Sequence, residues 1–579
     1  MQNRAVAQRL NQIADLLEIK GDQIFRINAY RRAARAVESL TEDIADVAAR
    51  GELTRIPGVG QSIAEKIEEF LRTGTMQAYE ELARSLPPGL ATLMSVPDVG
   101  PKTALLLYKH LGITTVDELE QAARAGRLRA LPRMGAKTEE NILKGIAVLR
   151  RSAARRPLGV VLPLADDLVA HLRRAPGLQE IEVAGSLRRR KETIGDIDIL
   201  VTSTKPEAVM DAFVRAPQVA QVLAHGPTRS SVILDAGIQA DLRVVEPAAY
   251  GAALQYFTGS KEHNVKLRER AVRRGLKLNE YGVWRASDDR RVAGRTEEEV
   301  YRAVGLPWIP PELREDQGEL EAAEAGRLPR LVDLDALRGD LHVHTRWSDG
   351  AETAEAMAQA ARALGYEYLC ITDHSQSLKF AGGVPPDDLR QHAAEARRLS
   401  ARLGIAVLIG TECDILPDGR LDYADDVLAE LDVVVASVHS RFAMSREQMT
   451  RRIVRALESG RVHVLGHPTG RLLGQRDPYE VDLEAVVEAA VRTGTALEIN
   501  ASPERLDLND AHARMARERG ARFVISTDAH QRGHLRHMVF GVSMARRGWL
   551  EATDVLNTLP LARFREALRR PTPARRRRA

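Results

Sequence analysis

The feature that most constrains this fold is a series of short apolar runs between residues 339 and 530. Seven runs follow one another, and each ends in a side chain that can bind a metal: GDLHVHT, YLCITDH, AVLIGTE, VVVASVH, VHVLGH, ALEIN and FVISTDAH. Helical stretches such as AEAMAQAARALG (354–365) and LEAVVEAAVRTG (483–494) separate them. Continuous Val, Ile and Leu runs that alternate with helices are typical of parallel strands buried on both faces. The pattern therefore predicts a β/α barrel, with its site at the carboxyl ends of the strands.

The polar residues at these strand ends form the first candidate site. A single histidine is more often a packed core or surface residue than a ligand, but here almost every run ends in one. Most of the 15 histidines lie after residue 336. Imidazole and carboxylate together suit zinc, manganese or iron, and a bridging carboxylate suits a cluster of ions.

The order HxH…D…H…E…H…H…DxH closely resembles the PHP phosphoesterase domain. The resemblance implies three divalent ions, zinc or manganese, and the hydrolysis of a phosphodiester or phosphomonoester. It assigns one ion to His342, His344, Glu412 and Asp528, a second to Glu412, His439 and His467, and a third to Asp349, His374 and His530. Many relatives have histidine at the position of Asp349, and a carboxylate there favours a harder ion such as manganese. Arg471 and Arg505 are candidate phosphate contacts, with surface ion pairs as the alternative.

A second feature is a phrase that occurs three times near the N-terminus. The copies are IPGVGQSIAEKI (56–67), VPDVGPKTALLL (96–107) and LPRMGAKTEENI (131–142). Glycine permits a tight turn, and the helix that follows offers free backbone N–H groups to a phosphate. The phrases resemble helix-hairpin-helix motifs, which bind DNA without reading its sequence. This resemblance implies DNA contacts at Gly58, Gly60, Gly100 and Lys102. We expect the third copy, with Arg133 and Met134 in its turn, to be the least active.

The segment FRINAYRRAARAV (25–37) predicts an amphipathic helix with a basic face. Beside the first hairpin phrase it closely resembles the small N-terminal domain of family X DNA polymerases. The resemblance implies DNA contacts from Arg26, Tyr30 and Arg31, and a Schiff-base lysine for abasic sites at Lys66. Ser62 stands where lyases of the family often have a second lysine, so binding of a 5′ phosphate in a gap is the favoured alternative.

The segment IEVAGSLRRRKETIGDIDILV (181–201) predicts two strands joined by a basic turn. Asp196 and Asp198 project together from the second strand, and GIQADLRVV (237–245) supplies Asp241 from another. Like charges so placed repel each other unless a cation lies between them, which predicts a two-metal site for Mg²⁺ or Mn²⁺. Exposed turn carboxylates are the alternative interpretation. The arrangement resembles the nucleotidyltransferase palm.

The triad leaves the substrate open, because transferases that modify antibiotics or tRNA share it. The segment YFTGSKEHNVKLRERA (256–271) closely resembles the thumb of family X DNA polymerases. By that resemblance Arg268 reaches the template minor groove, and the nucleotide contacts are Gly185, Ser186, Arg189, Gly195, Arg243, Tyr256, Phe257, Gly259 and Asn264.

A multidomain α+β and α/β protein is therefore expected. Residues 312–335 carry an excess of acidic side chains and read as a linker, and the last residues are rich in arginine. The expected parts are an N-terminal lyase-like helical domain (1–80), a helix-hairpin-helix domain (81–152), a nucleotidyltransferase palm (153–246), a thumb (247–311), an acidic linker (312–335), a distorted seven-stranded β/α barrel of the PHP type (336–568) and a basic tail (569–579).

Together these features predict a family X DNA polymerase fused to a PHP domain. It would fill short gaps in base excision repair, while the PHP site acts as a 3′→5′ exonuclease on DNA ends and incises abasic sites. The expected partners are gapped or primer-template DNA and dNTPs, and the chain is expected to act as a monomer. No run is long enough to span a membrane and the start lacks a signal-peptide core, so a cytoplasmic, nucleoid-associated protein is expected, with Cys370 and Cys413 as buried thiols.

Two alternatives remain open at this point. One is a nucleotidyltransferase for a small molecule or tRNA, fused to a metabolic phosphatase such as a histidinol-phosphatase-like domain. The other is a scaffold for DNA ends whose catalytic sites are silent.

Overall fold

The computed structural model describes residues 2–568 except 21, 39, 41–43, 57, 85–92, 94–95, 97–98, 133 and 154. The basic tail expected at 569–579 therefore lies outside the described residues. The chain divides into two compact units. The first comprises Met1–Arg156, Leu164–Ser186 and Gly195–Trp308; the second comprises Pro157–Pro163, Leu187–Ile194 and Ile309–Ala579. Within the described part of the chain, no helix has the length and apolar character that crossing a membrane requires.

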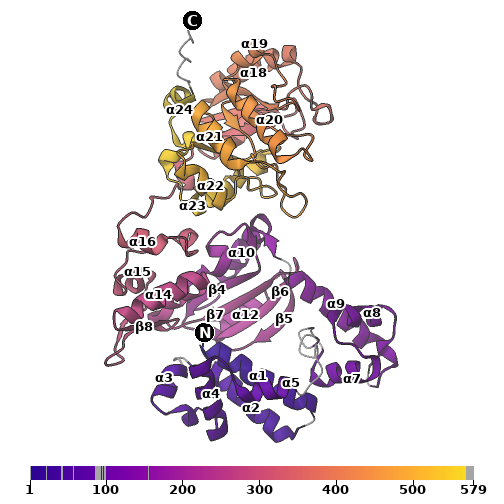
Figure 1. Ribbon diagram of the computed structural model, residues 1–579, viewed down its shortest axis with the longest axis vertical. Helices are drawn as coiled ribbons and strands as arrows, with labels where there is room; N and C mark the ends of the chain where they lie inside the picture. The colour runs from indigo at the N-terminus through magenta and orange to yellow at the C-terminus, as the bar shows by residue number, and fades with distance from the viewer. Residues whose placement is uncertain are drawn as a thin grey trace. The chain divides into compact units, whose positions relative to one another are not determined.

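The first unit begins with helices, drawn in indigo in Figure 1. They are α1 (Gln2–Lys20), α2 (Ile24–Glu38), α3 (Ile44–Ala49), α4 (Gln61–Thr73) and α5 (Gln77–Arg84). Aliphatic side chains from α1, α2 and α4 form their core, including Leu10, Ile13, Val37 and Ile67. A second core joins α7 (Pro101–Leu111), α8 (Val116–Arg124) and α9 (Ala136–Ala153).

The described residues of the three repeated phrases share one backbone contact. In each copy the second apolar residue donates its backbone N–H to the carbonyl of the first: Val59 to Ile56, Val99 to Val96 and Met134 to Leu131, at 3.0–3.1 Å. The helices α4, α7 and α9 begin directly after these turns. Gly58 has φ +87°, which explains why glycine occupies that position.

A five-stranded sheet follows in the first unit. Its order is β2-β4-β7-β6-β5, and β4 and β7 form the parallel pair in the middle of an otherwise antiparallel sheet. Helix α12 (Pro206–Val214) packs on it (Figure 1). The strands are β2 (Leu178–Val183), β4 (Asp196–Ser203), β5 (Val219–His225), β6 (Arg229–Leu234) and β7 (Gln239–Val244).

The predicted thumb forms a small α+β layer. Helices α13 (Tyr250–Thr258) and α14 (Lys261–Arg273) precede a three-stranded antiparallel sheet, and α15 (Glu297–Ala303) closes it. Its strands are β8 (Leu276–Asn279), β9 (Gly282–Arg285) and β10 (Arg291–Ala293). His263 on α14 is fully buried, and its Nε2 lies 2.9 Å from the Tyr301 hydroxyl.

The second unit contains the predicted barrel. Its seven strands are all parallel and pair in chain order. They are β11 (Gly339–Val343), β12 (Tyr368–Ile371), β13 (Ala406–Asp414), β14 (Val433–Ser437), β15 (Val464–Leu465), β16 (Ala496–Asn500) and β17 (Phe523–Ser526). A parallel bridge between Val343 and Ala529, with the His344 N–H 2.8 Å from the Ala529 carbonyl, nearly closes the sheet. The distorted seven-stranded barrel expected from the sequence is confirmed.

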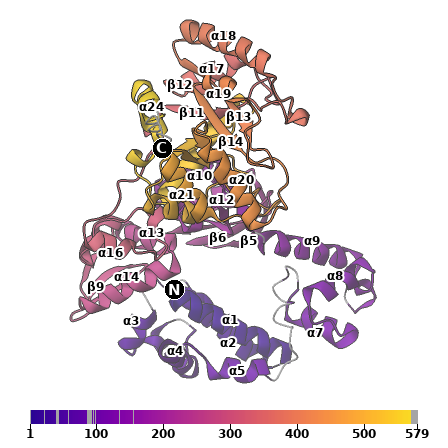
Figure 2. The same ribbon diagram turned by 45° about the horizontal axis from the view of Figure 1, so that its top comes forward.

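Helices cover the outside of this barrel (Figure 2). Side-chain oxygens of Thr353, Ser445, Asp482 and Asn509 accept the first free N–H groups of their helices, so the starts are fixed locally. The helices are α17 (Ala354–Ala363), α18 (Pro386–Leu403), α19 (Asp425–Ala429), α20 (Arg446–Glu458), α21 (Leu483–Thr493), α22 (Asp510–Glu518), α23 (Met538–Arg547) and α24 (Leu561–Leu568).

The acidic stretch 312–335 is folded and belongs to the second unit. It contains a 3₁₀ turn at Pro311–Leu313 and helix α16 (Glu319–Glu324). Arg314 is fully buried there, and Glu315 forms ion pairs with Arg189 and Arg547, each at 2.9 Å. Acidic residues in this stretch are thus neutralised by arginines that lie far away in the sequence.

Candidate functional site

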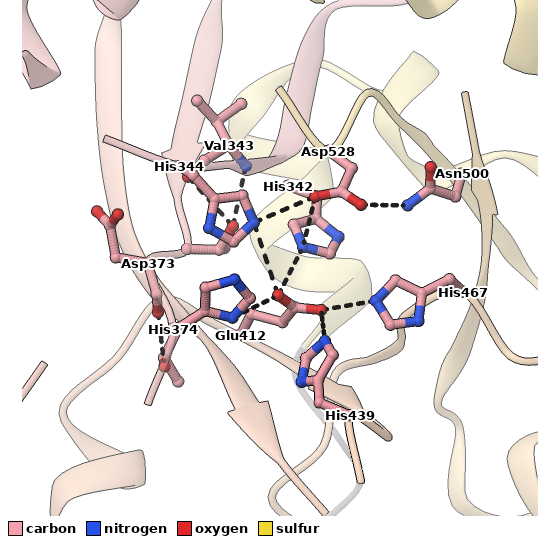
Figure 3. A network of polar contacts seen from close by, with 12 residues as sticks. His342, Val343, His344, Asp373, His374, Glu412, His439, His467, Asn500 and Asp528 are labelled. Atoms are coloured by element: carbon pink, nitrogen blue, oxygen red, sulfur yellow. Dashed lines mark hydrogen bonds and ion pairs between the residues drawn. The ribbon is translucent and has the colours of Figure 1, made fainter. Parts of the chain in front are cut away.

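The carboxyl ends of the barrel strands converge on Glu412, the side chain at the centre of Figure 3. Its two oxygens face different histidines. Oε2 lies 2.9 Å from His374 Nδ1, 3.4 Å from His342 Nε2 and 3.6 Å from His344 Nε2. Oε1 lies 2.8 Å from His467 Nε2 and 3.1 Å from His439 Nε2. Five imidazoles from four strands thus surround one fully buried carboxylate.

Asp528 and Asp349 extend this cluster. Asp528 Oδ1 lies 3.2 Å from His344 Nε2 and 3.7 Å from His342 Nε2. Asp349 lies 3.4 Å from His374 Nε2 and 3.5 Å from His530 Nε2. The structure therefore brings together all the side chains that the sequence analysis assigned to three ions, at the rim where a barrel places its site.

The cluster has the properties of a metal centre. Among the described residues, His342 Nε2 and His344 Nε2 are buried without a hydrogen bond of good geometry, although carboxylate oxygens lie 3.2–3.7 Å away. A buried imidazole nitrogen without a partner costs free energy unless an ion or water occupies its lone pair. Ligand atoms of His342, His344 and Glu412 lie within 4.8 Å of one another, as do those of His374, Glu412 and His439. The donor set fits divalent cations.

The surroundings of the cluster shift the pKa values of its carboxylates and imidazoles. Burial opposes ionisation of Glu412, but His439, His342 and His374 outweigh it and hold the pKa of this carboxyl well below its usual range. Burial, reinforced by His374, lowers the pKa of His344 to about 3. Burial also opposes protonation of His374 and His439, but Glu412 outweighs it and raises the pKa of His374 to about 10 and that of His439 to about 8. Metal ligands require neutral imidazole and ionised carboxylate, so ions that bind here displace protons from these two histidines.

A second layer of carboxylates, which the sequence analysis missed, holds the histidines. Glu498 Oε1 lies 2.7 Å from His342 Nδ1, and Asp414 Oδ1 lies 2.6 Å from His439 Nδ1. Such partners fix which ring nitrogen carries the proton and leave Nε2 free as an acceptor. The only sequence signal was strand alternation: Glu498 precedes Asn500 by two positions on a strand and so shares its face.

Two further buried acids stabilise the loops that carry the ligands. Asp373 accepts hydrogen bonds from the Thr345 N–H and hydroxyl at 2.8 and 2.7 Å. Asp340 accepts the Thr527 N–H at 3.1 Å. Burial raises the pKa of both carboxyls to about 6.

The first unit holds the second candidate site. Asp196, Asp198 and Asp241 each offer an oxygen within 4.8 Å of the others. Strands β4 and β7 pair in a register that sets Asp198 opposite Asp241. Ser231 donates to Asp241, and Gln239 does so at 2.9 Å. A Cβ atom at Gly185 would lie 2.8 Å from Asp198 Oδ2, so only glycine permits this approach.

The residues with predicted nucleotide contacts lie in different settings. Tyr256 and Phe257 stack edge to face at 5.2 Å, and Arg243 lies over the Phe257 ring. Asn264 donates to the Tyr256 carbonyl at 2.7 Å and accepts from Gln255. Ser186 follows Gly185 at the start of the short helix α11 (Gly185–Arg188), Gly195 precedes β4, Gly259 ends α13, and Arg268 donates to the Asn264 carbonyl. Arg189 pairs with Glu315 inside the second unit.

The residues with predicted DNA contacts lie on the N-terminal helices. Gly60 and Gly100 directly precede α4 and α7 and provide no side-chain cap, so the first N–H groups of both helices stay available to a phosphate. Arg26 and Arg31 pair with acids of α1 and its following turn, and Lys102 is largely exposed. Tyr30 is buried in the first helical core. Lys66 Nζ donates to the Ser62 carbonyl at 2.9 Å.

Four family models match the chain. They are a helix-hairpin-helix domain (residues 1–76), a SAM-like helix-hairpin-helix tandem (90–147), the DNA polymerase beta thumb (253–315) and the PHP domain (340–502).

Similar proteins extend this result. The chain is 38% identical over 573 residues to the DNA polymerase/3′-5′ exonuclease PolX of Bacillus subtilis, an alignment that covers 98% of this chain and 100% of that protein. It is 26% identical over 345 residues to rat DNA polymerase lambda, covering 54% and 56% of the two chains. It is 30% identical over 203 residues to a probable phosphatase of Caldanaerobacter subterraneus, covering 33% and 75%.

Proposed function

The chain belongs to the PolX family, the X-family DNA polymerases that carry a PHP domain, and we propose that its two acidic clusters catalyse two separate reactions on one DNA substrate. It is a DNA-directed DNA polymerase with a PHP-domain 3′-5′ exonuclease, and it depends on divalent metals. We infer that the finer role is the filling of short gaps in base excision repair.

The observation that carries this proposal is the presence of a complete ligand cluster in each unit. The aspartates Asp196, Asp198 and Asp241 lie in the first, and the set around Glu412 lies in the second. No histidine is needed as a base at the first cluster. A scaffold with silent sites would not need either cluster, and a small-molecule transferase would not need the helix-hairpin-helix domains.

At the polymerase site, we propose that Mg²⁺ or Mn²⁺ binds the three aspartates. When bound, such ions lower the pKa of the primer 3′-hydroxyl and balance charge on the leaving pyrophosphate. The chain's own residues supply position: Gly185 leaves room beside Asp198, and Gln239 holds Asp241 in place. The dNTP contacts expected at Tyr256, Phe257 and Arg243 form one connected group at the end of α13.

At the PHP site, we propose zinc or manganese ions held by the nine ligands of the cluster. When bound, they orient a phosphate and activate water at neutral pH. Glu498 and Asp414 orient His342 and His439 for this task. Arg505 Nε lies 3.2 Å from Asp528 Oδ2, and its Nη1 is buried without a partner among the described residues, which supports a contact with the substrate phosphate. Arg471 instead donates to the carbonyls of Arg505 and Leu506.

The third helix-hairpin-helix copy differs from the first two in a way that bears on which copies contact DNA. In the third copy, Glu139 is buried and accepts the N–H groups of Leu128 and Arg129 at 3.2 Å. Glu139 also pairs with the Arg129 side chain at 2.5 Å, so this cation is bound within the chain, which favours the first two copies as the DNA contacts. Lys66 is proposed as a Schiff-base lysine for abasic sites.

A gapped DNA duplex with a labelled primer tests the proposal. The wild type, Asp198→Ala and His344→Ala are compared with and without dNTPs. Asp198→Ala is expected to lose primer extension and keep 3′ trimming, and His344→Ala is expected to do the reverse. Loss of both reactions in either folded variant would refute two independent sites.

A further inference from the structure

We propose that two loops at the mouth of the PHP site form a platform for the single-stranded 3′ end of a nucleic acid, with Phe380 stacking on a base and Lys379 and Arg441 binding backbone phosphates. This inference rests on the exonuclease function proposed above and names residues that hold its substrate. We call these three residues the strand platform.

The first loop, residues 375–384, leaves the metal cluster directly after His374. Its two ends are joined, because the Val384 N–H donates to the His374 carbonyl at 2.9 Å. Ser377 donates its N–H to Asp422 at 2.8 Å, and Leu378 and Ala381 are buried. A Cβ atom at Gly382 would lie 3.3 Å from the carbonyl oxygen of Ser348, the neighbour of Asp349. The loop is therefore held against the segment that carries another ligand.

Phe380 points away from this held loop. Its side chain is 88% exposed, the largest exposed fraction among the large hydrophobic residues of the described chain. A single exposed apolar residue is common on protein surfaces and means little alone. Here it lies between two buried anchors in a loop that begins at a ligand of the metal site. Aromatic faces in such positions stack on nucleobases without regard to sequence.

Two exposed cations lie on loops that leave the same rim of the barrel. Lys379 precedes Phe380, and Arg441 follows His439 at the end of β14, two strands away from β12. Both side chains are exposed, and neither pairs with any residue that the structure describes. Backbone phosphates are the anions that an exonuclease substrate brings to this rim.

The conformation of Arg441 supports this assignment. It has φ +58°, which is uncommon for a residue other than glycine. Both neighbours are held: Arg452 donates to the Ser440 carbonyl at 2.7 Å, and Arg476 lies over the Phe442 ring at 4.2 Å. These contacts thus hold an exposed arginine in a turn that lies two residues after the ligand His439. Unfavourable backbone conformations that neighbours enforce are typical of functional sites.

The test compares two substrates of the full-length protein with Mn²⁺. One is a 5′-labelled single-stranded oligodeoxynucleotide, and the other is bis(p-nitrophenyl) phosphate, which has a phosphodiester but no nucleobase or neighbouring phosphate. The variants are Phe380→Ala, Phe380→Trp and the double variant Lys379→Gln/Arg441→Gln. Arg398→Gln is the matched control, because Arg398 is an exposed cation in the second half of α18, near the amino-terminal face of the barrel.

Phe380→Ala is expected to raise KM for DNA about 10-fold, which is within the range for loss of one base–aromatic stack, and Phe380→Trp is expected to restore it. The double variant is expected to reduce the slope of log(kcat/KM) against log salt by about 1.4, or ~0.7 for each lost phosphate contact. Kinetics on bis(p-nitrophenyl) phosphate should match the wild type in every variant.

The strand platform would be overturned if Phe380→Ala kept the wild-type KM for DNA and the double variant kept the wild-type salt slope. The exonuclease function would still stand in that case. Equal losses on both substrates would also overturn the strand platform, because the loops would then support the metal cluster rather than the strand. A wild-type protein that hydrolyses bis(p-nitrophenyl) phosphate but not DNA would refute the exonuclease function itself.

Discussion

The substitution Glu498→Gln tests how the buried second layer of the PHP site works. Glu498 is fully buried, and its carboxylate serves three groups at once. Oε1 accepts from His342 Nδ1 at 2.7 Å, while Oε2 accepts the His467 backbone N–H at 2.7 Å and the Asn500 amide at 3.2 Å. Glutamine has the same shape but only one acceptor oxygen.

Neither orientation of the glutamine amide can match all three hydrogen-bond partners of Glu498. If its oxygen faces His342, its NH₂ group opposes the donors of His467 and Asn500. If its NH₂ group faces His342, the ring must accept at Nδ1 and carry its proton on Nε2, the atom that faces Glu412 and Asp528. Loss of such an outer partner typically lowers metal affinity about 10–100-fold, which corresponds to about 1.4–2.7 kcal/mol.

Manganese titration by calorimetry, in parallel with exonuclease assays over a range of Mn²⁺ concentrations, measures this effect. The variant is expected to bind Mn²⁺ about 10–100-fold more weakly, to recover exonuclease activity with excess metal, and to extend primers like the wild type. Glu488→Gln on the exposed face of α21 is the matched control. Wild-type affinity in Glu498→Gln would refute the reasoning that this carboxylate selects the tautomer of His342.

Two further predictions concern other parts of the chain. Gly185→Ala places a Cβ atom 2.8 Å from Asp198 Oδ2 at a position with φ +62°, so primer extension should fall ~10²-fold while exonuclease activity stays unchanged in the same assay. Arg547→Ala removes the buried partner of Glu315 and Asp510 and should cost about 3–5 kcal/mol in urea unfolding at pH 7. Burial opposes ionisation of both carboxyls, but Arg189 and Arg547 keep the Glu315 pKa low and Arg547 keeps that of Asp510 low. The two ionised carboxylates therefore stabilise the fold at a pH above the ordinary pKa range of carboxyl groups. This stabilisation is lost as the pH falls below that range. The difference between variant and wild type should shrink from pH 7 to pH 3, and a constant difference would contradict the ion-pair account.

The parts of the fold that the sequence predicted well are those set by local patterns. Continuous apolar runs such as VVVAS on β14 specify a strand buried on both faces, and the repeated Gly turns specify their helix starts. The candidate metal ligands could be predicted for the same reason, because parallel strands bring their carboxyl ends to one rim.

The residues that were missed depend on contacts between distant segments. Glu498 and Asp414 lie in apolar strands, and only the folded barrel sets them against His342 and His439. The acidic stretch 312–335 reads as a linker from its charge, but Glu315 pairs with Arg189 and Arg547, which no local pattern connects to it. The resemblance to family X implies a DNA contact for Tyr30, yet this side chain packs into the first helical core.

The most direct test of two separate metal centres is anomalous diffraction from crystals soaked in Mn²⁺. The account predicts anomalous peaks among Asp196, Asp198 and Asp241 in the first unit and around Glu412 in the second, with Asp198→Ala removing only the former. Absence of manganese from either group of ligands in the wild-type crystal, or loss of both groups of peaks in Asp198→Ala, would contradict it.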